Sequence, residues 1–163
     1  MDTEIFPTSI EFLPYDTLTG RERYIACYED AWRIAHGSLQ GFHADTAWHA
    51  ALLRAAEDPQ ALTELRSGGE FAGVMCLELQ RGRFRGLGWI AFCYITPEHR
   101  REGMGRAMLE HAAACFLARN RRAMRLTVAP GNPALGFYER LGFVRVGSEP
   151  GALEALFVME KKL

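Results

Sequence analysis

Two glycines and three arginines between residues 100 and 106 could together bind an anion such as a phosphate group. The stretch before them, residues 89–95, is almost wholly apolar and is typical of a strand buried on both faces. The stretch after them, residues 106–118, is rich in helix formers, with apolar residues at helical spacing. Gly103 and Gly105 therefore lie at the first turn of a helix, where unpaired N–H groups and the positive end of the helix dipole attract an anion. We call residues 100–106 the anion-binding loop.

Gly103 and Gly105 alone are a weak signal, because an ordinary turn between a strand and a helix can contain the same residues. Two common nucleotide motifs do not fit: the loop lacks the Gly-x-x-x-x-Gly-Lys-Ser/Thr pattern of a P-loop and the third glycine of a dinucleotide fingerprint. What remains is Arg100-x-x-Gly103-x-Gly105. This pattern resembles the acetyl-CoA signature of the GCN5-related N-acetyltransferase (GNAT) family, Arg/Gln-x-x-Gly-x-Gly/Ala.

A second segment, residues 132–143, resembles the other hallmark of that family, an Asn-led helix carrying Phe-Tyr-Glu-x-x-Gly-Phe. Asn132 is a good helix cap, and Gly142 is expected to end the helix in a left-handed conformation. Tyr138 alone would more often be a core residue. Joined to the first motif at this distance, it becomes a candidate for catalysis. The resemblance covers roughly residue 71 to the C-terminus.

The resemblance implies how acetyl-CoA would be bound. In this family two central parallel strands separate, and the pantetheine arm of acetyl-CoA lies between them. By analogy, the backbone of residues 93–95 would bind the pantetheine, and the amides of residues 101–106 would hold the pyrophosphate. Tyr138 would donate a proton to the departing thiolate, and Asn132 would contact the pantetheine or only cap its helix. The expected acetyl-CoA contacts are Cys93, Tyr94, Ile95, Arg100, Arg101, Glu102, Gly103, Met104, Gly105, Arg106, Asn132 and Tyr138.

The resemblance does not supply a general base. Some relatives have a glutamate at the start of the strand before the loop, where this chain has Trp89. Glu78, on the neighbouring strand, is the nearest carboxylate and a weak catalytic candidate. Its alternation with Leu77 and Leu79 favours a solvated strand residue instead. An ordered water chain could also remove the proton.

The region between the first two helices is expected to shape the acceptor site. His36 and His43 flank this region, but no carboxylate or thiol is patterned with them, so we expect no metal there. Trp32, Phe42 and Trp48 could form an aromatic wall, although such residues are more often core.

Periodicity and turn residues predict the order β-α-α-β-β-β-α-β-α-β-β, which is an α/β fold with a mixed sheet and agrees with the GNAT-like acyltransferase topology. Asp45 or Thr46 is expected to cap the second helix. The fourth and fifth strands should be parallel, joined by a right-handed crossover. Strands are expected over residues 5–13, 61–66, 70–80, 89–95, 124–129, 143–147 and 153–160, and helices over 21–35, 45–57, 106–118 and 133–141.

Length and charge limit the class of protein. The 163 residues are expected to form one GNAT-like domain, 1–163. A net charge of -1 gives no reason to expect nucleic acid or a membrane as partner. No apolar run is long enough to span a membrane, and no signal peptide is evident, so we expect a cytoplasmic monomer or homodimer. The scattered cysteines are expected to be buried free thiols: Cys27, Cys76, Cys93 and Cys115.

The leading hypothesis is an N-acetyltransferase that moves an acetyl group directly from acetyl-CoA, as co-substrate and without a metal, to a primary amine. The amine would belong to a small molecule or a protein N-terminus. Two alternatives remain: a transferase that uses another acyl-CoA, and a non-catalytic CoA-binding or regulatory domain.

Overall fold

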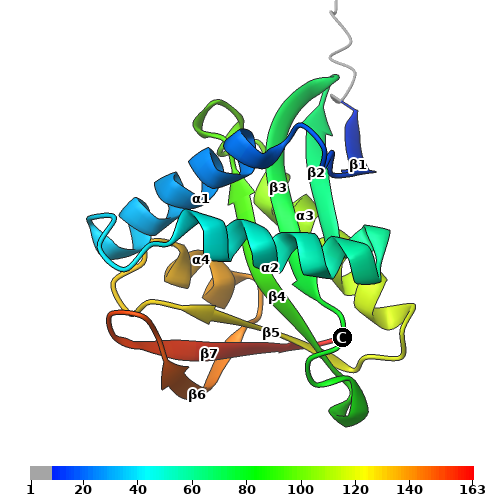
Figure 1. Ribbon diagram of the computed structural model, residues 1–163. Coiled ribbons are helices and arrows are strands. Elements are labelled where there is room, and N and C mark those ends of the chain that lie inside the picture. Colours follow the sequence, from blue (N-terminus) through cyan, green and yellow to red (C-terminus); the bar gives the residue numbers. More distant parts are fainter. Residues whose placement is uncertain (1–8) are drawn as a thin grey trace, which may run out of the picture.

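The computed structural model describes residues 9–163 and shows the predicted order of strands and helices (Figure 1). Within these residues, no helix is both long enough and apolar enough to cross a membrane. The elements are β1 (Ile10–Pro14), α1 (Arg21–His36), α2 (Ala44–Glu57), β2 (Leu62–Ser67), β3 (Glu70–Glu78), β4 (Leu87–Ile95), α3 (Met104–Leu117), β5 (Ala123–Val128), α4 (Ala134–Arg140), β6 (Val144–Pro150) and β7 (Ala155–Lys162).

Most predicted boundaries differ from the structure by a few residues, and the differences at the first strand and at α2 have identifiable reasons. The first strand begins at Ile10 among the described residues, and the predicted residues 5–8 lie outside them. The predicted cap of α2 was wrong, because the helix begins at Ala44 without a side-chain cap. Asp45 is not available as a cap, since its carboxylate pairs with Arg21 of α1.

One mixed sheet runs through the molecule in the strand order β1-β2-β3-β4-β5-β7-β6. All neighbouring strands are antiparallel except β4 and β5, which are parallel as predicted. The parallel pairing joins only residues 87–89 to residues 123–125. Beyond Trp89 the two strands are no longer paired, so the edge of β4 that faces β5 has no neighbouring strand there.

A β-bulge lies where β4 leaves β5. Cys76 of β3 pairs with Phe92, but the next residue, Leu77, pairs with Ile90. Ala91 is therefore the extra residue on β4. A bulge increases local twist and bends the strand that carries it, which turns β4 away from β5 at this point.

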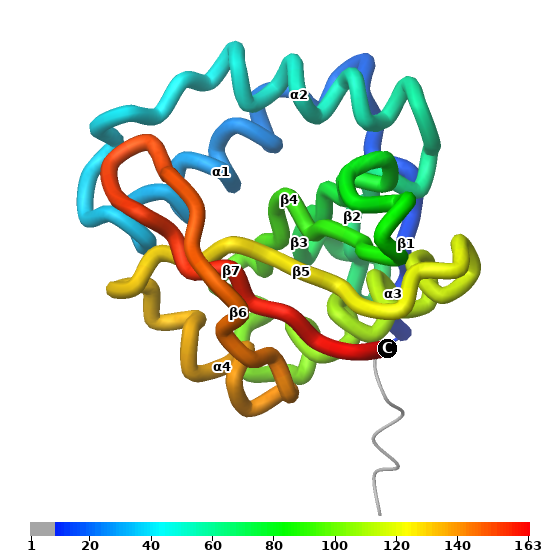
Figure 2. The backbone as a smooth tube through the Cα atoms, turned by 90° about the horizontal axis from the view of Figure 1, so that it is seen from below, coloured from blue at the N-terminus to red at the C-terminus, as the bar shows by residue number. Residues whose placement is uncertain are grey.

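The helices cover both faces of the sheet, as Figures 1 and 2 show: α1 and α2 lie on one face, and α3 and α4 lie on the other. On the α3 face, Met108 and Phe116 belong to a buried apolar cluster. On the α1–α2 face, Tyr24, Trp48 and Phe92 belong to a second cluster. The sheet thus separates two cores.

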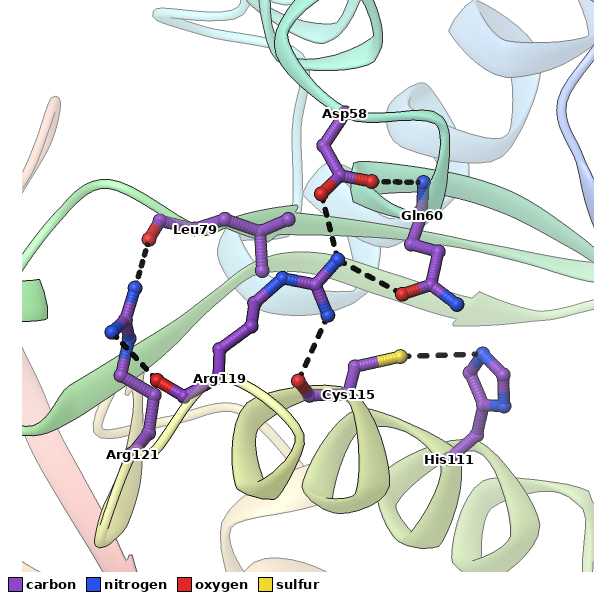
Figure 3. Close-up of polar contacts among 7 residues, drawn as sticks. All are labelled: Asp58, Gln60, Leu79, His111, Cys115, Arg119 and Arg121. Carbon is purple, nitrogen blue, oxygen red and sulfur yellow. Dashed lines mark hydrogen bonds and ion pairs between the residues drawn. The ribbon is translucent and has the colours of Figure 1, made fainter.

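The chain between α3 and β5 is fixed by two arginines (Figure 3). Arg119 donates to the Asp58 carboxylate at 2.6 Å and to the Cys115 carbonyl at 2.9 Å. Arg121 donates to the Leu79 carbonyl at 2.8 Å. These contacts hold the start of β5 at the end of the sheet where it pairs with β4.

All four cysteines are free thiols, as predicted. Cys27, Cys76 and Cys115 are buried. Cys93 is only half-buried, which distinguishes it from the others.

Gly88, in the short parallel pairing, should tolerate no side chain. A Cβ there would lie 2.3 Å from the ring of Phe116, which is fully buried. We expect Gly88→Ala to lower the free energy of unfolding by about 1–3 kcal/mol, because overpacking forces the ring to move. Gly147→Ala is the control, since a Cβ there meets nothing within 4 Å. Urea denaturation of both variants measures the difference, and equal midpoints would contradict the packing argument.

Candidate active site

The backbone of the anion-binding loop leaves most of its N–H groups without acceptors in the described part of the chain. Arg101 and Gly103 have positive φ angles of 67° and 79°. α3 begins at Met104, directly after them. None of the N–H groups of residues 101–106 donates to an acceptor within residues 9–163. Six consecutive free donors at a helix N-terminus form a site for an anion.

The Arg100 side chain contacts both β4 and α1. Its Nε donates to the Ile95 carbonyl at 3.0 Å, and its Nη2 donates to the Asp30 carboxylate of α1 at 3.3 Å. Tyr94 also donates to Asp30. The side chain of Arg100 therefore connects the loop to α1.

A cleft of about 610 Å³ opens beside the loop, which we call the loop cleft. This size suits a small-molecule site. It brings together most of the residues predicted to contact acetyl-CoA. Those that line it are Cys93, Tyr94, Ile95, Arg100, Arg101, Gly103, Met104, Gly105, Arg106 and Tyr138.

Two of the predicted contacts lie elsewhere. Glu102 does not line the loop cleft; its carboxylate is 3.5 Å from Nδ1 of His99. Asn132 accepts a hydrogen bond from the Ala134 amide at 2.9 Å, which is the capping role considered from the sequence. Asn132 also lines the neighbouring cavity described next.

A smaller cavity of about 180 Å³ occupies the gap between the separated strands β4 and β5, and we call it the gap cavity. Cys93 and Tyr138 line both the loop cleft and the gap cavity. The Tyr138 hydroxyl lies 3.5 Å from the Cys93 sulfur. These two side chains thus stand where the two spaces meet.

Burial sets the protonation of this pair. It raises the pKa of Tyr138 well above its ordinary value, so the hydroxyl keeps its proton at neutral pH. Burial likewise raises the pKa of the Cys93 thiol. The junction therefore holds a phenol that can donate a hydrogen bond and a thiol that is not ionised.

A third cavity of about 360 Å³, the outer cavity, lies between the sheet and the helices α1 and α2. It shares Tyr28, Trp32, Ile90, Ala91 and Thr127 with the gap cavity. Each space shares lining residues with the next, so the three lie one after another through the gap between β4 and β5, from the anion-binding loop to the α1–α2 face. We call this series of spaces the path.

Residues 20–143 match the acetyltransferase (GNAT) family, and the resemblance in the two motifs is confirmed. The chain belongs to this family. A comparison with curated protein sequences gives no match.

Solved GNAT structures share the fold at low identity. A GCN5-related N-acetyltransferase from Kribbella flavida aligns with a TM-score of 0.72 and 17% identity, over 94% of this chain and 98% of that one. The PaiA N-acetyltransferase of Thermoplasma acidophilum, in complex with coenzyme A, aligns with a TM-score of 0.66 and 18% identity, over 95% and 99%. The ribosomal-protein-S18-alanine N-acetyltransferase of Escherichia coli aligns with a TM-score of 0.63 and 18% identity, over 94% of each chain.

Glu78 does not lie on a solvated face of this GNAT protein, and that prediction was wrong. Its side chain is 22% exposed, pairs with Arg54 and lies 3.6 Å from Arg81. All three line the outer cavity. Strand alternation could not indicate this environment, because Arg54 comes from α2, which crosses that end of β3.

The predicted aromatic wall is divided between cavity and core. Trp32 and Phe42 line the outer cavity, together with Tyr28 and Trp89, which sequence reasoning had not placed there. Trp48 is 7% exposed and belongs to the apolar core. No sequence signal separates these cases, since all are aromatic residues of the first two helices, their loop or a strand.

The two histidines lie at different points along the path. His43 is exposed and lines the outer cavity, whereas His36 lines the gap cavity with Cys93 and Tyr138. Residues 9–163 contain no group of three or more His, Cys, Asp and Glu side chains placed to hold a metal ion.

Gly103 allows the clearest test of the anion-binding loop. It has a positive φ, and a Cβ there meets nothing within 4 Å, so a side chain would enter the space beside the free amides. We expect Gly103→Val to raise the dissociation constant of CoA about tenfold or more in calorimetric titration.

Gly69→Val is the matched control, because Gly69 also has a positive φ and open space but lies in the β2–β3 turn. It imposes similar backbone strain far from the loop, and CoA affinity should not change. Equal affinities in both variants would remove the site from this loop. Gly105→Val is less informative, since its Cβ would lie 2.8 Å from the ring of Phe137.

Proposed function

We propose that this chain acts as a single domain that transfers an acetyl group directly from acetyl-CoA to a primary amine. One observation carries the proposal: the Tyr138 hydroxyl stands where the cleft beside the anion-binding loop meets the cavity in the gap between β4 and β5. A donor group from one side and an amine from the other would meet at this hydroxyl.

The residues present fit acetyl-CoA. The free amides of residues 101–106 would hold the pyrophosphate, and Gly103 leaves the approach to them open. The unpaired edge of β4 beyond Trp89 would accept and donate hydrogen bonds to the pantetheine amides. When bound, acetyl-CoA supplies a thioester, an activated form of the acetyl group. The gap cavity, at about 180 Å³, favours a small acyl group over a long one.

Direct transfer is favoured over an acetyl-enzyme. Cys93 is the nearest nucleophile, but burial raises its pKa and no base contacts it within the described residues. An unionised thiol attacks poorly, because the thiolate is the reactive form. Tyr138 instead suits a proton donor, since burial keeps it protonated.

The outer cavity is proposed to bind the acceptor. Its aromatic residues favour an acceptor with an apolar part, and its charged side chains are two arginines and one glutamate: Arg54, Arg81 and Glu78. This charge balance disfavours polycations. A small-molecule amine and a protein N-terminus both fit, and one fold neighbour, the ribosomal-protein-S18-alanine N-acetyltransferase, is named for a protein acceptor.

The proposal is tested by thiol release from acetyl-CoA with a panel of acceptors. The panel contains 2-phenylethylamine, an Ala-Phe peptide amide, a polyamine and an aminoglycoside. We expect release with one of the first two and little with the polycations. CoA binding without release from any acceptor would support the non-catalytic alternative.

Tyr138→Phe tests the proton donor, because it keeps the ring and removes only the hydroxyl. We expect kcat to fall about 100-fold, with the KM for acetyl-CoA little changed. Because the pKa of Tyr138 is raised, the loss should persist across neutral and mildly alkaline pH, with no basic limb due to this group.

The control is Tyr28→Phe, a second partly buried tyrosine that lines the gap cavity and makes no side-chain hydrogen bond within residues 9–163. Its kcat should stay within about threefold of the wild type. If Tyr138→Phe also stays within that limit, the proton comes from water or from the amine.

Phe42 and Trp48 separate acceptor binding from core packing. We expect Phe42→Ala to raise the acceptor KM about fivefold or more, because an apolar contact in the outer cavity is lost. Trp48→Ala should lower the free energy of unfolding by about 3–5 kcal/mol, because its ring is buried in the core. Steady-state kinetics and urea denaturation of both variants make the comparison, and a Phe42 variant that loses only stability would assign Phe42 to the core.

A further inference from the structure

His36 is placed to act on the acceptor amine. It is the last residue of α1 and lines the gap cavity that Tyr138 and Cys93 also line. Its side chain is only 9% exposed. The Trp32 ring lies 4.6 Å from the imidazole, centroid to centroid, and limits its rotation.

The two ring nitrogens of His36 have different surroundings. Nδ1 is buried without a hydrogen-bond partner within residues 9–163, and the Glu154 carboxylate lies 3.8 Å from it. Nε2 also lacks a protein partner in this part of the chain, but it is not buried. A carboxylate beside Nδ1 favours the tautomer with its proton on Nδ1, which leaves the Nε2 lone pair free.

Glu154 is held near His36 by the packing of two loops. Leu153, its neighbour in the turn between β6 and β7, lies 3.2 Å from the point where Gly41 would carry a Cβ. Figures 1 and 2 both show this turn beside the loop between α1 and α2. The contact of 3.8 Å is longer than a hydrogen bond, but such contacts in unliganded sites often shorten when substrate binds.

We propose that His36 is the general base of the acetyl transfer and that Glu154 is its positioning residue. This inference rests on the proposed function. Nε2 takes one proton from the ammonium form of the acceptor, directly or through one water, and the neutral nitrogen then attacks the acetyl carbon. The second proton on that nitrogen is released to solvent as the amide forms. The C–N bond forms, the C–S bond breaks, and the thiolate receives its proton from Tyr138. The proton on His36 then passes to solvent, and Tyr138 is reprotonated from it.

The other groups near His36 are consistent with this role. His36 lies at the C-terminal end of α1, toward which the negative end of the helix dipole points. The charged and titratable groups around it are Glu154, Arg33 and Tyr28 on α1, and Cys93 and Tyr138 across the cavity. Both of the last two are uncharged when burial keeps them protonated.

Glu78 is the rival base, and its position is less suitable. It pairs with Trp89, four residues before Cys93 on β4, which is about 13 Å along a strand. Its carboxylate is already paired with Arg54 and Arg81. Arg54 contacts one oxygen of this carboxylate and Arg81 contacts the other, so neither oxygen is free to approach an amine.

The test measures kcat/KM against pH for His36→Gln, Glu154→Gln and Glu78→Gln, with His49→Gln as the histidine control. His49 is an exposed residue of α2 and lines none of the three spaces. The acceptors are 2-phenylethylamine and the Ala-Phe peptide amide, which are protonated or partly so at pH 7, and hydroxylamine, which is largely neutral there. We expect His36→Gln to lower kcat/KM for 2-phenylethylamine and the Ala-Phe peptide amide about 100-fold at pH 7. The decrease should become smaller at higher pH, because more of the amine is then already neutral. Hydroxylamine transfer and CoA affinity should stay within about threefold.

The remaining variants test which residue is responsible for the acidic limb of the pH profile. Glu154→Gln should move the acidic limb of the profile to lower pH, since a protonated imidazole loses its carboxylate neighbour. His49→Gln should change neither limb, and Glu78→Gln should lower kcat/KM by less than about tenfold. The proposal is overturned if His36→Gln keeps kcat/KM for the two protonated acceptors within threefold of the wild type. It is also overturned if this variant loses hydroxylamine transfer as strongly as transfer to those acceptors, or if Glu78→Gln removes the acidic limb. A wild type that binds CoA but acetylates none of the three acceptors would instead overturn the proposed function, and this inference with it.

Discussion

The parallel pairing of β4 and β5 ends after three residues, and the rest of the site depends on that early end. Pairing to the end of both strands would fill the gap with backbone hydrogen bonds. The bulge at Ala91 bends β4 where the pairing stops, and Gly88 lets the Phe116 ring pack against the part that remains paired. Arg119 and Arg121 hold the start of β5 in the same region (Figure 3). The packing and the hydrogen bonds at the paired end of β4 and β5 therefore fix where the two strands separate.

Helix α1 crosses this opening and is joined to both of its sides. On the β4 side, the carboxylate of Asp30 accepts hydrogen bonds from Tyr94 and Arg100. On the β7 side, His36 approaches Glu154. The signature arginine of the family motif thus has a structural task here, because its side chain connects the anion-binding loop to the helix that covers the acceptor path. A displacement of α1 should consequently alter the position of both the anion-binding loop and the residues that line the gap cavity.

Local features of the site could be predicted from the sequence, and features made by distant partners could not. The free amides of the loop and the left-handed Gly142 follow from short-range rules for helix ends, so the motifs located them correctly. The order of strands and helices followed from hydrophobic periodicity for the same reason. The surroundings of Glu78 were missed, because Arg54 is 24 residues away and no local pattern connects them. The predicted cap of α2 was wrong for the same reason, since the Asp45 carboxylate forms an ion pair with Arg21 on another helix.

The proton transfer at the junction depends on a difference between two pKa values that burial moves in the same direction. With reference values of about 8.5 for a thiol and about 10 for a phenol, donation from tyrosine to a thiolate is uphill by about 2 kcal/mol. Burial raises the pKa of Tyr138 further, which alone would make it a worse acid. The Cys93 sulfur lies 3.5 Å from the same hydroxyl and so occupies surroundings similar to those of a leaving thiolate. Burial raises the pKa of the Cys93 thiol as well. Burial destabilises the phenolate and the thiolate alike, so the free-energy cost of proton transfer from Tyr138 to the thiolate need not increase. Because its pKa is raised, Tyr138 also keeps its proton at the alkaline pH where the amine is neutral and reactive.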